Sequence, residues 1–275
     1  MRRPFAQVDV FAAAPFAGNP VAVVLDAGGL STEEMQRLAH WTNLSETTFV
    51  LPPRAPGADY RVRIFTPNLE LPFAGHPTLG TAHAWLEHRG SAVTRVLQEC
   101  GAGLVEVRRT PEGLAFAAPP LVRDGPVEAR LVARIARILG LGREQIVDAQ
   151  WADNGPSWIA VLLADADAVL AVAPGWVEEL DLGVAGPHPS GAPADWEVRA
   201  FFAKDGATVE DPVTGSFNAA RAGWLARTGR ATLPYVARQG TTLGRDGRVH
   251  LSGDPDGRIW VAGTTTTMVT GELEA

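Results

Sequence analysis

The chain has 275 residues, of which 46% are hydrophobic, enough for a packed core in one large domain or two of ordinary size. A formal net charge of -7 with no run of like charges argues against a nucleic-acid surface or a polybasic membrane surface, so we expect a small-molecule partner. The only cysteine, Cys100, excludes an internal disulfide and a metal site built from clustered cysteines.

Strands and helices mix from the start of the chain. Alternating apolar and polar residues predict half-buried strands at Phe5–Phe11 and Tyr60–Phe65. Between them, Ser31–Asn43 is typical of a helix, because Ser31 and Glu34 have the spacing of a capping box. The apolar side of this helix would consist of Met35, Leu38, Ala39 and Trp41.

A proline-rich passage divides the chain near its middle. Before it, Leu104–Arg108 and Leu114–Ala118 predict an antiparallel hairpin across a Thr-Pro-Glu-Gly turn. After Pro119–Pro126, an amphipathic helix is predicted at Val127–Leu139. We therefore place a domain boundary after residue 120. Further strands are predicted at Trp158–Leu163, Trp196–Phe202, Val249–Leu251 and Ile259–Ala262.

The sequence predicts neither a signal peptide nor a membrane-spanning helix. Gln7 and Asp9 interrupt the apolar N-terminal stretch, which favours a strand over a signal peptide. The longest apolar region, Ile159–Ala173, is too short to span a bilayer and contains Asp165 and Asp167. We expect a cytoplasmic protein with no membrane partner.

Two segments of the chain repeat one pattern. Pro72 and Gly75 precede WLEHRG at residues 85–90, and Pro212 and Gly215 precede WLARTG at residues 224–229. Both read PxxG, a helix-length segment and WLxxxG, although the spacing differs by one residue. Chance similarity in a sequence rich in alanine and glycine is the alternative. Together with the recurring strands, the pattern favours duplication of one α/β unit.

The stretch LPFAGHPTLG, residues 71–80, joins a predicted strand to a predicted helix. A turn at Gly75 lets the backbone approach a ligand, and the first amides of the helix lack intrahelical partners. Such a helix end attracts a carboxylate or phosphate, and Pro77 is tolerated in its first turn. His76, at the start of the helix, can donate a hydrogen bond or move a proton near neutral pH.

The stretch EDPVTGSFNAA, residues 210–220, has the same form, with Asp211 before its turn and Ser216 after it. Two such helix ends would hold an anionic substrate. For either segment alone, the alternative is a strand-to-helix turn rich in capping residues.

A third stretch, NLSETTFV at residues 43–50, places Glu46 between polar hydroxyls and an apolar strand. Burial there would raise its pKa toward the range useful for general acid–base catalysis. A single glutamate of this kind is more often a surface or capping residue, so its role depends on the other motifs.

Five stretches, in this order, resemble the PhzF-like family, named for the isomerase of phenazine biosynthesis. They are GNP (18–20), LSETTFV (44–50), LPFAGHPTLG (71–80), EDPVTGS (210–216) and QGTTLGRDGRV (239–249). The resemblance implies a diaminopimelate-epimerase-like α/β (α+β) fold: two similar halves, each a curved, mostly antiparallel sheet around a central helix, with the active site in the cleft between them. Residues 1–120 would form the N-terminal half, to which 264–275 return, and 121–263 the C-terminal half. The central helices would begin near His76 and Ser216.

The resemblance also implies which residues act. Glu46 would move a proton as general acid/base. Asp211 would bind an amino or hydroxyl group of the substrate, while His76 and Ser216 orient the substrate and help relay the proton. The implied substrate-binding positions are Gly75 and Gly215, whose amides would hold a carboxylate, together with Asn19 and Thr214.

One feature separates this chain from the epimerases and racemases related to the family, and another departs from the family's own pattern. Related epimerases and racemases use one cysteine per half, but Ala74 stands beside the first turn here and Cys100 lies in neither motif. A two-thiol mechanism is therefore excluded at this site. Phe217 and Asn218 follow the second turn, where small residues are expected, and would reshape the pocket.

The sequence therefore predicts a cofactor-independent isomerase or epimerase that acts on a small carboxylated substrate without a metal or redox cofactor, and the family implies a homodimer. A non-catalytic small-molecule-binding protein that retains the cleft is the alternative. A metal-dependent hydrolase is disfavoured, because His76 and His83 have no HExxH or carboxylate cluster beside them. A pyridoxal-phosphate enzyme would depend on Lys204, the only lysine. The sequence contains neither a GxGxxG nor a GxxxxGK run, the motifs that would indicate nucleotide binding.

Overall fold

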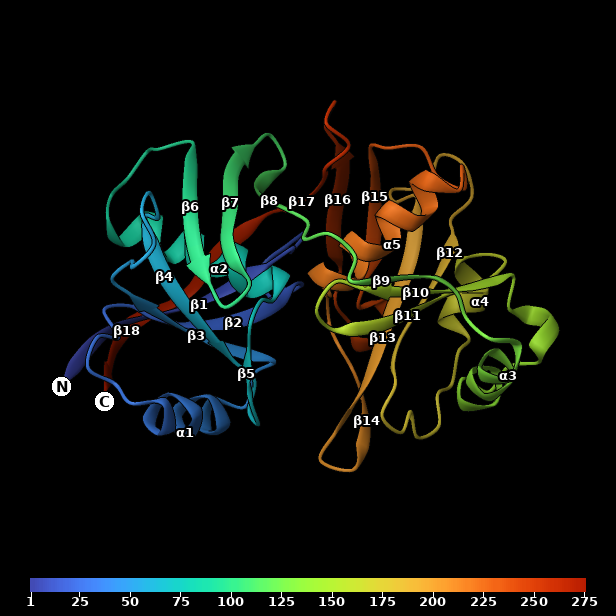
Figure 1. Ribbon diagram of the computed structural model, residues 1–275, viewed down its shortest axis with the longest axis horizontal. Coiled ribbons are helices and arrows are strands. Elements are labelled where there is room, and N and C mark those ends of the chain that lie inside the picture. The colour runs from blue at the N-terminus through green and yellow to red at the C-terminus, as the bar shows by residue number, and fades with distance from the viewer. The chain divides into compact units, whose positions relative to one another are not determined.

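The computed structural model describes residues 1–275 and divides the chain into two compact units (Figure 1). Unit 1 comprises Met1–Ala117 and Ala262–Ala275, and unit 2 comprises Ala118–Val261. The two chain ends lie together in unit 1, where the Met1 ammonium group donates to the Ala275 carbonyl at 2.7 Å. None of the helices is long and apolar enough to cross a membrane.

Unit 1 is a mixed sheet with two helices. Its strands are β1 (Arg2–Val10), β2 (Asn19–Val24), β3 (Glu46–Leu51), β4 (Tyr60–Phe65), β5 (Glu70–Leu71), β6 (Arg95–Cys100), β7 (Gly103–Thr110), β8 (Gly113–Ala117) and β18 (Thr265–Glu274). Its helices are α1 (Thr32–Thr42) and α2 (Gly75–His88). The strand order is β18-β1-β2-β3-β4-β6-β7-β8, with β5 also on β4. Only β2–β3 and β4–β6 are parallel, because α1 and α2 provide the crossovers that parallel pairing needs.

Unit 2 is built in the same way. Its strands are β9 (Arg123–Pro126), β10 (Asp148–Asp153), β11 (Ser157–Leu162), β12 (Asp181–Pro187), β13 (Trp196–Lys204), β14 (Ala207–Glu210), β15 (Tyr235–Gln239) and β16 (Gly247–Gly253). A further strand, β17 (Ile259–Gly263), begins in unit 2 and extends beyond Val261, the last residue of that unit. Its helices are α3 (Ala129–Ile138), α4 (Ala166–Leu170) and α5 (Gly215–Arg227), with short 3-10 turns η1 (Arg143–Gln145) and η2 (Thr241–Leu243). The strand order is β9-β10-β11-β12-β13-β15-β16, with β14 also on β13.

The pairing directions of the two sheets are the same. The steps β1-β2-β3-β4-β6-β7 and β10-β11-β12-β13-β15-β16 both run antiparallel, parallel, antiparallel, parallel, antiparallel. In both units the first of these strands takes one more antiparallel neighbour, β18 or β9. The PxxG glycines, Gly75 and Gly215, begin corresponding helices. The prediction of two similar α/β halves is therefore confirmed.

The capping box predicted for the first helix is present. The Ser31 hydroxyl accepts from the Glu34 amide at 3.2 Å, and the Glu34 carboxylate accepts from the Ser31 amide at 2.8 Å. Met35 and Ala39 are buried, but Trp41 is 78% exposed, so its placement on the apolar side was wrong. Position 41 lies about 200° around the helix from position 39, which turns its side chain away from the sheet.

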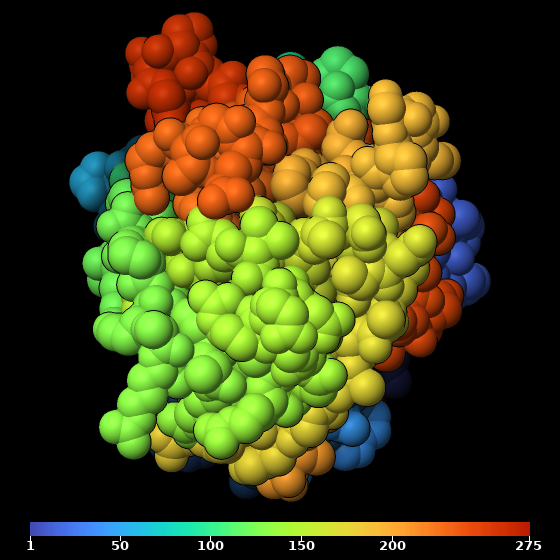
Figure 2. Space-filling view, turned by 90° about the vertical axis from the view of Figure 1, so that its right-hand side faces the viewer, coloured from blue at the N-terminus to red at the C-terminus, as the bar shows by residue number.

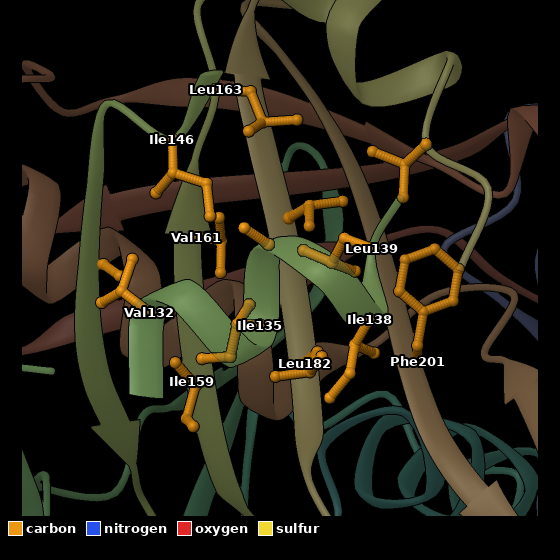
Figure 3. Close-up of a cluster of buried hydrophobic side chains, with 14 of the residues drawn as sticks. Val132, Ile135, Ile138, Leu139, Ile146, Ile159, Val161, Leu163, Leu182 and Phe201 are labelled. Carbon is orange, nitrogen blue, oxygen red and sulfur yellow. The ribbon is translucent and has the colours of Figure 1, made fainter. Parts of the chain in front are cut away.

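One hydrophobic cluster of unit 2 lies between α3 and the sheet (Figure 3). One face of α3, with Val132, Ile135 and Ile138, packs against side chains of β11 and β12. These include Ile159, Val161, Leu182 and Val184. The opposite face of α3 carries exposed arginines, and this part of the chain, green to yellow-green in Figure 2, covers the centre of the face turned to the viewer. Residues 182 and 184 point toward α3, so 181 and 183 point toward α5.

Candidate active site

Glu46 and His76 come together in unit 1 although they lie thirty positions apart in the sequence. Glu46 begins β3, and His76 is the second residue of α2. The hydroxyl of Thr81 on α2 donates to that of Thr48 at 2.8 Å, so this side of β3 faces the helix. Glu46, two residues before Thr48, points the same way. Its Oε2 lies 3.3 Å from His76 Nε2, and the two side chains are 14% and 4% exposed.

Asn19 extends this pair into a row of three. It is the first residue of β2 and fully buried, and its amide nitrogen lies 3.4 Å from His76 Nδ1. The preceding turn is held by Asp9, whose carboxylate accepts from the Gly18 amide at 3.0 Å. A Cβ on Gly18 would lie 2.2 Å from the Val10 carbonyl oxygen, so only glycine fits this turn. Three predicted site residues from three separate motifs therefore lie side by side.

Burial determines the charge of His76. It lowers the pKa of the imidazole to about 3, while the Pro20 carbonyl acts in the opposite direction. The sequence led us to expect titration near neutral pH, and the structure differs because the ring is enclosed. At neutral pH His76 is an uncharged hydrogen-bonding group beside the Glu46 carboxyl group.

The low pKa of His76 predicts that acid destabilises the protein. Below pH 6.5 the unfolded chain binds a proton at this residue, whereas the folded chain does not bind it until about pH 3. Stability is therefore lost as pH falls from 6.5, by about 3 kcal/mol at pH 4 from this group. Urea unfolding of His76→Gln should show a smaller loss between pH 7 and pH 4 than the wild type. His40→Gln, at an exposed position, is the control, and an equal loss in all three proteins would contradict the assignment.

The second predicted constellation lies in unit 2, where β14 leads into α5. The Thr214 hydroxyl, just before the helix, donates to Asp211 Oδ2 at 2.6 Å. Ser216 Oγ accepts from the indole nitrogen of Trp158 at 3.0 Å, and the Ser216 carbonyl accepts from the Asn154 side chain at 2.9 Å. Because an indole nitrogen only donates, the hydroxyl hydrogen of Ser216 remains available to another acceptor.

The first turns of α2 and α5 are both without a side-chain cap. Ala74 cannot provide one, and the Thr214 side chain is engaged with Asp211 instead. The amides of Gly75 and Gly215 thus lie at helix ends whose partial positive charge suits a carboxylate. This arrangement fits the binding role predicted for the two glycines.

Phe217 and Asn218, which depart from the expected small residues, are both fully buried in unit 2. Phe217 packs against Gly183 and against the Trp158 ring, with ring centroids 5.5 Å apart. The Asn218 side chain donates to the Thr214 carbonyl at 2.9 Å. These two side chains therefore pack beneath the turn that carries Ser216.

Sequence reasoning missed three polar residues around this turn, namely Asn154, Trp158 and Asp181. Asp181 begins β12 and pairs with Trp158 of β11, just as Glu46 begins β3 and pairs with Val21 of β2. Asp181 is thus the counterpart of Glu46 in the second unit. Burial, with a smaller contribution from Asp153, raises its pKa to about 6. Aligning the two repeats strand by strand is the signal that identifies it.

Replacing Asp181 with Asn is expected to stabilise the protein at pH 7. Between about pH 4 and 6 the folded chain retains a proton that the unfolded chain releases, so stability falls as pH rises through this window. Removing the charge should raise the free energy of unfolding by roughly 1–3 kcal/mol at pH 7 and leave it almost unchanged at pH 4. Urea unfolding at both pH values measures this. Asp256→Asn, in an exposed turn, is the control, and an equal gain at both pH values would refute the explanation.

Comparison with known proteins places the chain in a family. The family described as phenazine biosynthesis-like protein (PhzC-PhzF) matches residues 8–271. Antisense-enhancing sequence 1 of Schizosaccharomyces pombe is 33% identical, covering 98% of this chain and 97% of that protein. Trans-2,3-dihydro-3-hydroxyanthranilate isomerase of Pseudomonas fluorescens is 36% identical, covering 86% of each.

The fold agrees with this assignment. The crystal structure of a PhzF-family phenazine biosynthesis protein of Bacillus anthracis superimposes with a TM-score of 0.84 over 100% of both chains, at 24% identity. At that identity the likeness shows the fold, whereas the family follows from the sequence matches. The chain therefore belongs to the phenazine biosynthesis-like (PhzC-PhzF) family, whose relatives include named isomerases.

Proposed function

We propose that the protein catalyses cofactor-independent proton transfer on a small carboxylated substrate, with Glu46 as the general acid/base. The observation that carries this proposal is the Glu46 carboxyl group 3.3 Å from the buried His76 ring, whose pKa burial lowers to about 3. A cationic partner would hold the carboxylate ionised and make it a weak base. A neutral partner lets the same group take up and release a proton during each turnover.

The proposed reaction is balanced by one proton. The Glu46 carboxylate removes a proton from a carbon next to an activating group, and the electron pair of the broken C–H bond moves into the adjoining unsaturated system. The resulting carboxylic acid returns a proton to another carbon of the same molecule. Substrate and product then have the same composition, and no oxidant or reductant takes part.

The other predicted residues have binding roles in this proposal. Asn19 positions the His76 ring, which in turn orients the Glu46 carboxyl group. In unit 2 the Asp211 carboxylate accepts a hydrogen bond from an amino or hydroxyl group of the substrate. The Ser216 hydroxyl donates a hydrogen bond to the substrate. The uncapped amides of α2 and α5 hold the substrate carboxylate.

Solvent exchange tests the proposed activity. The purified protein would be incubated in D₂O with cyclic and acyclic amino- and hydroxy-acids, and the panel includes trans-2,3-dihydro-3-hydroxyanthranilate because a relative's name specifies it. We expect deuterium to enter one compound at carbon, as followed by proton NMR. Binding of a compound without any exchange would favour the alternative, a binding protein. The homodimer stays a prediction, which light scattering would test.

A further inference from the structure

A buried cation lies at one end of a hydrogen-bond chain that ends on Asp211. Arg221, on α5, has no exposed surface, and no carboxylate forms an ion pair with it. Its guanidinium carbon lies 5.3 Å from the ring centroid of Trp196 and 5.5 Å from that of Tyr235. Its one side-chain hydrogen bond goes from Nη2 to Asn218 Oδ1 at 3.1 Å, while Nε and Nη1 have no partner. Burial without a counter-charge is costly, so this position calls for an explanation.

The chain continues through four buried side chains. Asn218 Nδ2 donates to Gln239 Oε1 at 2.9 Å. Gln239 Nε2 donates to the Thr214 hydroxyl oxygen at 2.9 Å and to the Asp211 carbonyl at 3.1 Å. The Thr214 hydroxyl donates to Asp211 Oδ2 at 2.6 Å. Gln239 belongs to the QGTTLGRDGRV stretch, to which the proposed mechanism gives no other role.

The cation at one end of this chain sets its direction. A guanidinium group only donates, whatever the charge of the group at the other end. Asn218 must therefore turn its oxygen to Arg221 and its nitrogen to Gln239, and Gln239 must turn its nitrogen to Thr214. Two backbone contacts agree independently: the Thr214 amide donates to Gln239 Oε1 at 3.0 Å, and the Thr214 carbonyl accepts from Asn218 at 2.9 Å.

We propose that Arg221 is a positioning residue for Asp211: it fixes the direction of the Asn218–Gln239–Thr214 chain, so that the Thr214 hydroxyl always donates to the Asp211 carboxylate and this carboxylate stays ionised. Bonds that all point one way polarise one another, so the effect of the cation reaches Asp211 through the chain. Because only an ionised Asp211 suits the binding of a substrate amino group, the catalytic meaning of this inference rests on the proposed function.

The titratable and charged groups around Arg221 stay neutral or form contacts of their own. Tyr235 is the titratable group that faces the guanidinium, and burial raises the pKa of its hydroxyl, which stays neutral. Several charges on the surrounding strands form pairs, namely Glu210 with Arg199, Glu197 with His188, Asp148 with Arg230, and Asp246 with both Arg238 and Arg248. The Asp195 carboxylate, which acts on Tyr235, accepts from the Val236 amide at 2.8 Å.

The test measures Asp211 itself and needs no substrate. The side-chain carboxyl carbon of Asp211 would be titrated by ¹³C NMR in the full-length protein and assigned with Asp211→Asn. In Arg221→Met we expect the midpoint to rise by roughly one pH unit. In Arg221→Lys, which keeps the charge, most of the shift should be reversed. Arg227→Met removes an exposed charge from the same helix and should leave the midpoint unchanged.

Two results would overturn the proposal. One is an Arg221→Met protein that folds like the wild type and titrates Asp211 at the same midpoint. The other is an equal shift in Arg227→Met, which would mean that net charge alone is responsible. If Arg221→Met fails to fold, Asn218→Leu interrupts the chain with the cation retained, and an unchanged Asp211 midpoint in that variant would equally overturn it. Because no readout depends on turnover, failure of the proposed reaction would leave these outcomes intact.

Discussion

Replacing Glu46 with Gln is expected to lower deuterium exchange by roughly 10²- to 10⁴-fold, the range that general acid–base catalysis contributes. The amide keeps the shape of the side chain at the start of β3 but cannot take up a proton from carbon. His76, 3.3 Å away, cannot substitute for it, because burial lowers the pKa of the ring to about 3 and leaves a poor base. Proton NMR in D₂O with a responsive compound measures the loss.

Matched variants separate the loss of the base from damage to the site. Glu112→Gln makes the same chemical change in an exposed turn and should retain full exchange. Glu46→Asp keeps an ionisable group but withdraws it by one methylene, and a misplacement of about 1 Å costs on the order of 10²-fold. Binding of the compound to Glu46→Gln should persist. If that variant exchanged at the wild-type rate, the base would have to be another residue.

The sequence predicted those features that depend on neighbouring residues. The capping box of Ser31 and Glu34, the alternation in β4 and the hairpin of β7 and β8 are local patterns, and each lies where it was expected. Glu46 and His76 were found because each lies in a short motif. That these side chains meet depends on the parallel pairing of β2 with β3 and on α2 covering that face, which no single motif specifies.

What the sequence missed depends on pairing between distant strands. The hydrogen bond from Trp158 to Ser216 joins β11 to α5, and the two residues lie fifty-eight positions apart in the chain. Nothing near Trp158 in the sequence indicates a site. In the sequence Arg221 is typical of an ordinary basic residue on a helix, and only the structure shows that it is fully buried. Phe217 shows the same limit, since its size is unexpected after a substrate-binding turn and is explained only by the space above Gly183.

Gly183→Ala is expected to destabilise the protein by about 1–3 kcal/mol, and by more if the ring cannot move. A Cβ at this position would lie 2.1, 2.2 and 2.4 Å from three ring atoms of Phe217, whose side chain is fully buried. Alanine normally suits a strand better than glycine, so the sign of the effect depends on this one contact. Urea unfolding measures the stability, and exchange on a responsive compound should fall as well, since Phe217 follows Ser216.

A double-mutant cycle assigns the destabilisation to that contact. Phe217→Leu alone leaves a cavity and should be destabilising, but combined with Gly183→Ala it makes room for the new methyl group. The double variant should therefore lose less stability than the summed losses of the two single variants, and this coupling should be about 1 kcal/mol or more. Gly271→Ala, in β18, places a methyl group where no atom lies within 4 Å and should be neutral or slightly stabilising. Additive effects of Gly183→Ala and Phe217→Leu would mean that the backbone of β12, rather than the ring, absorbs the strain, and Ser216 should then keep its position and its function.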